Sequence, residues 1–416
     1  MTRIAMIVWN EFRNDARVLK EAQTLQSAGY AVTVFALHTP GVTQEKETLQ
    51  GGIKVVRVAR SPLWKLRKTR TGAEVGAATP PAASGAIGRL SPAKQVLRII
   101  ARLWTHAGLL TRIAWHRAAV VHAHDVNTLP TAWLAAKLSG ARVVYDAHEI
   151  STSREGYNSF RGLVARVEAA LMPRVQGTIT TTDARAKFFA RAYGIPRPMV
   201  LQNRPRLTVS PASQRIREEL QLQQPWPIVI YQGGLQQGRG LERLVRIAAS
   251  VKNAYFVFIG GGRLTAPLTA LSQELELTER VHFIPTVSLA DLPSYTASAD
   301  IGVQPIENTC LNHFTTDSNK LFEYLIAGLP VVATDLPEIR RIVRAHDIGL
   351  LVRESDDQQL IDALNRLVND PMLRQTLAAN AANAAKQLNW EQQEAQLVSL
   401  YGCVLKDQPY CAEAGQ

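Results

Sequence analysis

Cysteine is scarce in this chain of 416 residues and occurs only at Cys310, Cys403 and Cys411. This odd number and these spacings fit neither a disulfide framework nor a zinc-binding motif, so we expect a reducing cytoplasm. No run reaches about 18 uninterrupted apolar residues, which excludes a membrane-spanning helix. The apolar run near the N-terminus lacks the length and the cleavage site of a signal peptide.

Acidic residues are few in the first half of the chain. Residues 1–205 contain 29 Lys and Arg against 12 Asp and Glu, a net charge of +17, whereas residues 206–416 contain 18 and 23, a net charge of −5. The basic half predicts an anionic partner, such as a phosphorylated substrate, anionic lipid or nucleic acid. Nucleic acid is the least favoured, because the basic residues lack interleaved aromatics and no nucleic-acid-binding module is recognisable.

Apolar strands alternate with helical segments along both halves. A strand at 3–9, a helix at 15–28 and a strand at 31–37 form a βαβ unit, which predicts a parallel sheet. Further strands are expected at 55–59, 119–122, 143–146, 178–181, 228–232, 255–259, 281–284, 301–304, 331–334 and 350–352. The chain is too long for one ordinary core. We therefore predict an α/β fold with two Rossmann-like doubly wound parallel-sheet domains facing a central cleft.

The predicted boundaries are 1–205 for the first domain, 206–389 for the second, and 390–405 for a C-terminal helix that crosses back to the first. Within the first domain, residues 61–117 carry ten basic residues and one acidic residue. A low-complexity basic loop is followed there by apolar residues at helical spacing. This pattern favours a membrane-surface element, with peripheral association at the inner face of the plasma membrane. The alternative is a solvated helix that packs its apolar face on the domain.

The segment NKLFEYLIAGLPVVATD at 319–335 is the most informative motif. A helix carrying Lys320 and Glu323 runs into a Gly-Leu-Pro turn and a buried strand. This arrangement places a cation, a carboxylate and a helix N-terminus at one edge of a parallel sheet. A nucleotide-sugar needs these groups, because the diphosphate takes cations and N–H donors and the ribose takes a hydrogen-bond acceptor.

Two glycine-rich turns precede this motif. The first, YQGGLQQGRGLERL, contains Gly233 and Gly234 after a strand, and Arg239 before a helix. The second contains Gly260 and Gly262. Glycine allows a close backbone approach to phosphate, and arginine can contact a phosphate in a bidentate manner.

In this order, GGLQQGRGLERL, FIGGGRL, RVHFIPTV, YTASADIGVQPIE and NKLFEYLIAGLPVVATD resemble the donor-binding domain of the family-4 retaining glycosyltransferases, which have the two-domain GT-B fold. The first half is similar more loosely, through NDARVLKEAQ, HAHDVNTLP, VVYDAHE and TTTDARAKFF. The resemblance implies transfer of a hexose, with retention, from a UDP- or GDP-sugar to a lipid-linked or polysaccharide acceptor. A role in bacterial exopolysaccharide, capsule or lipopolysaccharide synthesis is expected.

The resemblance also implies roles for individual donor-site residues. Glu323 matches the glutamate that binds the ribose hydroxyls, and Arg239 stands where a phosphate-binding lysine is usual. Lys320 would reach the diphosphate, and Ser318 and Asn319 would offer backbone N–H groups. We expect Arg239 and Lys320 to act in catalysis by stabilising the leaving diphosphate.

On the first domain, His148 matches the histidine that lies near the transferred sugar and is the third expected catalytic residue. By the switch-point rule, the loop after the first strand borders the cleft. We therefore expect Asn10, Arg13, Asn14 and Asp15 to bind the acceptor. Asp15 has an equally good alternative as the N-cap of the following helix.

Two departures from the family pattern leave alternatives open. Thr315 replaces a second glutamate, and Gly234 stands where an arginine is common. Contacts to the sugar would then come from Glu307, Asn312 or Thr316. A catalytically silent homologue that binds a nucleotide-sugar or a partner enzyme, and a sugar-nucleotide epimerase, are the alternative functions.

We expect no cofactor and no metal ion. His122 and His124 could suggest metal binding, but we expect their side chains to point to opposite faces of the strand end. The chain also has no Asp-x-Asp pair of the kind that holds a divalent cation against a diphosphate. Arg239, Lys320 and helix N-termini would neutralise the diphosphate charge instead.

Overall fold

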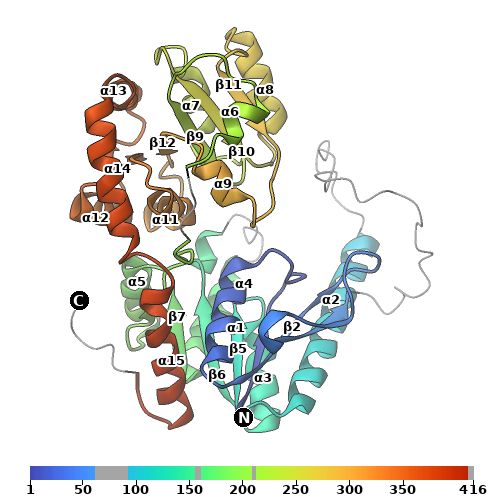
Figure 1. Ribbon diagram of the computed structural model, residues 1–416. Helices are drawn as coiled ribbons and strands as arrows, with labels where there is room; N and C mark the ends of the chain where they lie inside the picture. Colours follow the sequence, from blue (N-terminus) through green and yellow to red (C-terminus); the bar gives the residue numbers. More distant parts are fainter. Residues whose placement is uncertain (61–91, 155–160, 209–211, 411–416) are drawn as a thin grey trace. The chain divides into compact units, whose positions relative to one another are not determined.

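The computed structural model describes residues 1–60, 92–154, 161–208 and 212–410. The chain divides into two compact units: Met1–Gln202 together with Gln393–Gln416, and Asn203–Gln392. No helix among the described residues is long and apolar enough to cross a bilayer. The two units are described separately below (Figure 1).

The first unit contains an eight-stranded sheet in the order β3-β4-β2-β1-β5-β6-β7-β8. Its strands are β1 (Arg3–Ile7), β2 (Ala31–His38), β3 (Lys46–Thr48), β4 (Lys54–Ala59), β5 (Val120–His124), β6 (Arg142–Ala147), β7 (Gly177–Thr180) and β8 (Met199–Val200). All pairings are parallel except β3 with β4. The strand order reverses between β1 and β5, so the loops after these strands lie at the switch point, where α/β sheets bind ligands.

Helices lie between these strands along the chain, except the C-terminal helix, which follows the last strand of the second unit. They are α1 (Ala16–Ser27), α2 (Pro92–His116), α3 (Leu129–Ser139), α4 (Arg161–Leu171), α5 (Asp183–Tyr193) and α15 (Glu391–Leu405), with short 3-10 turns at Gln50–Gly52, Ser151–Ser153 and Met172–Arg174. Leu109 and Ile113 of α2 are fully buried in a core with Leu129 and Ala132 of α3 and with apolar residues of the sheet. This burial anchors the C-terminal half of α2.

The second unit contains a six-stranded, wholly parallel sheet in the order β11-β10-β9-β12-β13-β14. Its strands are β9 (Ile228–Gln232), β10 (Tyr255–Ile259), β11 (Val281–Ile284), β12 (Ile301–Gln304), β13 (Val331–Thr334) and β14 (Gly349–Val352). Here the order reverses between β9 and β12. The loops after these two strands meet, since the Glu307 N–H donates to the Gly238 carbonyl at 3.1 Å.

Helices cover both faces of the second sheet. They are α6 (Arg215–Glu219), α7 (Leu241–Ile247), α8 (Thr265–Glu274), α9 (Leu292–Thr296), α10 (Leu311–Phe314), α11 (Asn319–Ile326), α12 (Pro337–His346), α13 (Asp357–Asn369) and α14 (Pro371–Ala385). One core joins α7, α8 and α13 to the sheet, and the other joins α9, α11, α12 and α14 to its opposite face. The mostly apolar composition of these strands follows from burial on both faces of the sheet.

The N-terminal half of α2 is not packed in the way its C-terminal half is. Six apolar side chains there are each more than half exposed: Val96, Leu97, Ile99, Ile100, Leu103 and Trp104. We call these six residues the exposed apolar patch of α2. The predicted basic loop before the helix, residues 61–91, lies outside the described residues, as does the side chain of Lys94.

Candidate active site

The glycine turns of the second unit pack backbone against backbone. A Cβ atom at Gly260 would lie 2.1 Å from the Gly233 carbonyl oxygen, and Gly260 has a φ of +138°. Gly233, with a φ of +123°, donates its N–H to the Ile259 carbonyl at 2.9 Å. Gly262 is equally tight, since its Cβ would meet the Leu235 oxygen at 2.2 Å. Gly260 and Gly262 have no room for a side chain and Gly233 has a φ that favours glycine, so the two turns pack closely at the end of β9.

A buried lysine lies beside this turn. Lys320 on α11 is only 7% exposed, and its Nζ donates to the Tyr231 hydroxyl at 3.3 Å and lies over the Tyr231 ring. Burial first, and the nearby Arg239 guanidinium second, lower the pKa of Lys320 to about 7, against the opposing effect of Glu323. Within the described residues neither Lys320 nor Arg239 is in an ion pair. The two basic side chains therefore lie near each other without an ion-pair partner in the described part of the chain, and Glu323 is the carboxylate that acts on Lys320 electrostatically.

Glu323 lies one helical turn after Lys320 on the same face of α11. Its Oε2 accepts from Gln232 Nε2 at 2.5 Å, and Gln232 Oε1 in turn accepts from the Thr296 hydroxyl at 2.8 Å. This chain of hydrogen bonds fixes the orientation of a half-buried carboxylate at the end of β9. A carboxylate held in this way is a suitable acceptor for a pair of ligand hydroxyls.

The N-terminus of α11, where we expected the backbone N–H groups of Ser318 and Asn319 to be available to an anion, has only part of this arrangement. Ser318 is the N-cap, with a φ of 52°, and its N–H donates to the Thr316 hydroxyl at 3.2 Å. The Ser318 N–H is therefore already used inside the loop. Asn319 is exposed at the first turn of the helix, where backbone N–H groups point outward.

His148 is the centre of the candidate site in the first unit. Its Nε2 lies 2.9 Å from Asp146 Oδ2 and its Nδ1 lies 3.7 Å from Asp125 Oδ1. Asp146 is fully buried and accepts two hydrogen bonds from the Arg17 guanidinium, at 2.8 and 2.9 Å. Burial alone would raise the pKa of Asp146, but Arg17 and then His148 outweigh this effect and hold the pKa well below its usual range.

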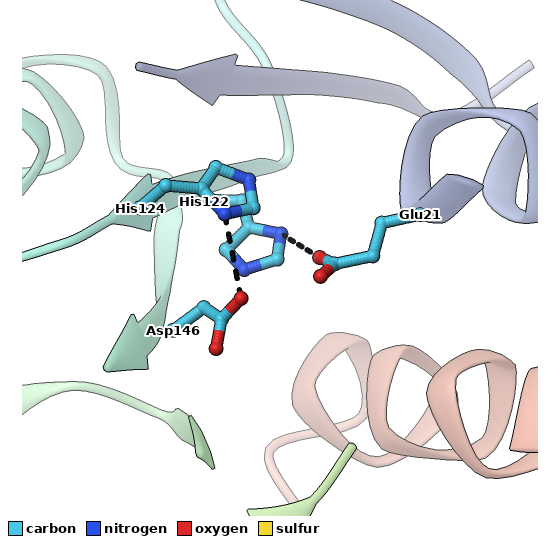
Figure 2. A group of neighbouring side chains, drawn as sticks. All are labelled: Glu21, His122, His124 and Asp146. Carbon is cyan, nitrogen blue, oxygen red and sulfur yellow. Dashed lines mark ion pairs between the residues drawn. The ribbon is translucent and has the colours of Figure 1, made fainter. Parts of the chain in front are cut away.

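Behind His148 lies a group of four buried side chains: Glu21, His122, His124 and Asp146 (Figure 2). The expectation that the two histidines point to opposite faces is wrong. Residues two apart in a strand share a face. The imidazole ring centroids of His122 and His124 accordingly lie 4.1 Å apart. Figure 2 shows His122 paired with Glu21 and His124 paired with Asp146, at 3.8 and 3.5 Å.

These four residue types would suit zinc, but a cation of the chain is already in contact with both carboxylates. Arg17 Nε lies 3.1 Å from Glu21 Oε1 and 2.8 Å from Asp146 Oδ2. Burial, with Asp146 next, raises the pKa of Glu21 well above its usual range and favours its protonated form. The Arg17 guanidinium therefore already supplies a positive charge to both carboxylates. A divalent ion would add two charges against the guanidinium, so we assign no metal to this group.

The loop after β1 has two kinds of residue. Asp15 is the N-cap of α1: its Oδ1 accepts from the Val18 N–H at 3.2 Å, and its Oδ2 accepts from Asn10 at 2.7 Å. Arg13 and Asn14 are exposed. A cavity of about 560 Å³ lies beside this loop, and polar residues such as Arg13, Asp15 and Arg57 line it together with the apolar side chains of Phe12, Leu19, Val42 and Leu49.

Two family models match consecutive parts of the chain. "Glycosyl transferase 4-like domain" matches residues 15–204, and "Glycosyl transferases group 1" matches residues 212–384. This chain is a family-4-type glycosyltransferase with the GT-B fold. The two matches meet near the division between the two units.

Individual relatives of this glycosyltransferase agree with the family. A D-inositol 3-phosphate glycosyltransferase of Xylanimonas cellulosilytica is 24% identical over 94% of this chain and 92% of its own length. Sucrose-phosphate synthase from Thermosynechococcus elongatus has a TM-score of 0.77 at 19% identity, covering 98% of this chain and 100% of that chain. Anabaena HepE in complex with UDP-glucose has a TM-score of 0.72 at 17% identity, covering 97% and 100%.

Several residues of the glycosyltransferase's candidate site were not predicted from the sequence. Arg17 and Asp146 escaped because their contact joins positions 129 residues apart. Gln232 and Tyr231 end a strand, and nothing in their spacing distinguishes them from core residues. Thr315, the substitute for the family's second glutamate, is buried and donates to the Leu311 carbonyl of its own helix at 2.7 Å.

Proposed function

We propose that this glycosyltransferase moves a hexose from a UDP- or GDP-sugar to a lipid-linked or polysaccharide acceptor with retention at the anomeric carbon. The single observation that carries the donor assignment is that Lys320 and Arg239 lie near each other without an ion-pair partner among the described residues, one helical turn from the anchored Glu323 carboxylate. A diphosphate would supply the missing negative charge, and ribose hydroxyls would bond to Glu323.

In the proposed step, the bond between C1 and the diphosphate oxygen breaks and its electron pair stays with the diphosphate. The bond between C1 and the acceptor oxygen forms on the same face of the sugar, and the acceptor hydroxyl proton passes to the leaving diphosphate. Lys320 and Arg239 stabilise the charge that develops on the diphosphate. His148 holds the sugar. No metal ion and no cofactor takes part in this proposal.

The acceptor would bind beside the loop after β1. Arg13 is exposed at a cavity lined by both polar and apolar side chains, which suits an acceptor that carries a phosphate next to a less polar part. Asn14 is exposed on the same loop, whereas Asn10 and Asp15 bond to each other and shape it. A role in exopolysaccharide, capsule or lipopolysaccharide synthesis would follow from such an acceptor.

We further propose a peripheral location at the inner face of the plasma membrane. The exposed apolar patch of α2 supports this location, because six large apolar side chains and the exposed Arg98 and Arg102 share one helix. Binding to vesicles containing anionic lipid should weaken with added salt and when Leu97 and Ile100 are changed to Ser. Exchange of the exposed Leu138 for Ser is the matched control.

The basic residues that precede α2 in the sequence give a second arm of this test. Neutralising Lys65, Arg67, Lys68 and Arg70, which lie outside the described residues, should weaken binding to anionic vesicles, while neutralising the exposed Arg191 should not. Vesicle binding that is unchanged in both the apolar and the charge variants would refute the membrane location. It would leave the donor assignment untouched.

The donor assignment is tested by a thermal-shift panel with UDP, GDP, ADP and their common sugar conjugates. A ligand that binds only the folded protein raises the unfolding midpoint. We expect a shift with one base, lost in Glu323→Ala and kept in Glu274→Ala, a change at an exposed glutamate of α8 in the same unit. No shift with any nucleotide would contradict the donor site.

A catalytically silent homologue is the second candidate, because the Thr315 hydroxyl is committed to its own helix and cannot replace a glutamate carboxylate. Slow hydrolysis of the donor above background, abolished by Glu323→Ala, would exclude this candidate. Product analysis in the absence of an acceptor distinguishes the transferase and the silent homologue from an epimerase, because an epimerase forms its product without an acceptor.

A further inference from the structure

The two ring nitrogens of His148 both face carboxylates. Nε2 lies 2.9 Å from Asp146 Oδ2, and Nδ1 lies 3.7 Å from Asp125 Oδ1. A neutral imidazole carries one proton, so it would turn a lone pair toward one of these anions. Only the imidazolium presents an N–H to each of them. The 2.9 Å contact is a hydrogen bond and the 3.7 Å contact is an ion-pair distance, so the two carboxylates together favour the protonated ring.

The frame around His148 holds this geometry in place. The His148 carbonyl accepts from the Arg185 guanidinium at 2.7 Å, which fixes the backbone. Asp125 has a φ of +63°, and its N–H donates to the Asp146 carbonyl at 3.0 Å. Arg154 contacts the other oxygen of Asp125 at 3.2 Å. Both carboxylates are thus held from behind, and the ring between them has little freedom.

We infer that Asp146 and Asp125 are positioning residues that hold His148 as a fixed imidazolium, so that the site histidine donates hydrogen bonds and does not act as a general base. The part of the inference that concerns what His148 contacts rests on the proposed function, whereas the part that concerns the charge of its ring does not. Arg17 has a supporting part, because its two hydrogen bonds orient Asp146.

Of His122, His124 and His148, the last is the one whose surroundings favour the protonated ring. Burial lowers the pKa of His122 and of His124, which stay neutral. Burial would also lower the pKa of His148, and Arg17 adds to this, but Asp146 and then Asp125 outweigh both and raise it to about 9. The titratable and charged groups around it are Arg17 and Glu21 of α1, His122, His124 and Asp125 at β5, Asp146 of β6 and Arg185 of α5.

The consequence concerns the acceptor proton. Under this inference His148 is an imidazolium between pH 6 and 8. An imidazolium has no free lone pair on its ring nitrogens, so it cannot take the proton of an acceptor hydroxyl. The proton must pass to another group, for which the leaving diphosphate is the base in the proposed step. Transfer rates would stay level as the pH rises from 6 to 8, whereas a histidine base of ordinary pKa would make them rise.

The direct test is NMR of the full chain labelled with 15N and 13C in histidine, with the His148 signals assigned by comparison with His148→Gln. We expect imidazolium shifts at pH 8 and a titration midpoint near 9. In Asp125→Asn, the midpoint should fall by roughly one unit or more, because one of the two opposite charges is lost. The control variant Asp183→Asn changes a partly exposed carboxylate of α5 in the same unit and should leave the titration midpoint of His148 unchanged.

Asp146→Asn should lower the midpoint further than Asp125→Asn does, and Asp146→Glu should restore part of the loss. If Asp146→Asn does not fold, the wild-type titration and Asp125→Asn still decide the question. A wild-type midpoint at or below 7, or a midpoint that Asp125→Asn does not move, would overturn the inference. Because this readout needs no donor, it can fail or succeed independently of the thermal-shift panel.

Discussion

Burial of the Lys320 side chain, which we propose binds the diphosphate, should reduce the free energy of unfolding of the protein. The pKa of Lys320 falls from 10.5 to about 7, chiefly because burial removes the ammonium group from water. A fall of this size corresponds to a folding penalty on the order of 4 kcal/mol at pH 7. Lys320→Met removes the charge and keeps a flexible chain of similar length. We therefore expect the variant to be more stable than the wild type.

The loss of the Nζ contact reduces this gain. The Tyr231 hydroxyl would lose its 3.3 Å partner, at a cost of about 1 kcal/mol. We expect a net stabilisation of roughly 2–3 kcal/mol at pH 7 in urea unfolding of the second unit. Between pH 7 and 10.5 the unfolded chain binds more protons than the folded one. The penalty is therefore fully present below pH 7 and disappears as the pH rises to 10.5, so the variant's advantage should shrink at pH 9.

Two measurements test this prediction. The first is the free energy of unfolding in urea at pH 6 and at pH 9, and the second is the nucleotide affinity measured by calorimetry. Lys252→Met, at an exposed lysine in the same unit, should change neither stability nor its pH dependence by more than about 0.5 kcal/mol. Lys320→Met should lose nucleotide affinity while gaining stability. A variant that is no more stable than the wild type at pH 6 would refute the burial argument, and an unchanged nucleotide affinity would refute the site.

Three further outcomes follow from the described contacts. Gly260→Ala should destabilise the protein by about 2–4 kcal/mol in urea unfolding, because its Cβ would lie 2.1 Å from the Gly233 oxygen; Gly402→Ala, with no neighbour within 4 Å, is the tolerated control. Asp15→Ala should cost about 1 kcal/mol through loss of the α1 N-cap, and a neutral effect would contradict the capping role. Nucleotide binding should survive dialysis against EDTA, since Lys320 supplies the positive charge; loss of binding that added divalent metal restores would refute a metal-independent site.

The strands of the second unit were predictable because burial on both faces makes them continuous apolar runs. The predicted bounds match β9, β10, β11, β12 and β13. The first sheet was less predictable at its edges. The strands β3 and β8 contain only three and two residues, and so short a pattern does not distinguish a strand from a loop.

The donor residues were predictable for a different reason, which is that Lys320 and Glu323 share one helix and their relation is set by helical spacing. The surroundings of His148 were not. Asp146 is two residues away in sequence, but Arg17 comes from α1 and the two meet only because β1, β5 and β6 lie side by side in the sheet. No local pattern encodes such a contact.

The sequence by itself determined two parallel-sheet α/β domains, their order and the family, because periodicity and short motifs are local properties of the chain. Only the tertiary structure decided which charges meet. It brought Arg17 against Asp146, buried Lys320 beside Tyr231, and left Lys320 and Arg239 without an ion-pair partner among the described residues. The physical reason is that charge state depends on burial and on neighbours, and both are set by strand order rather than by spacing along the chain.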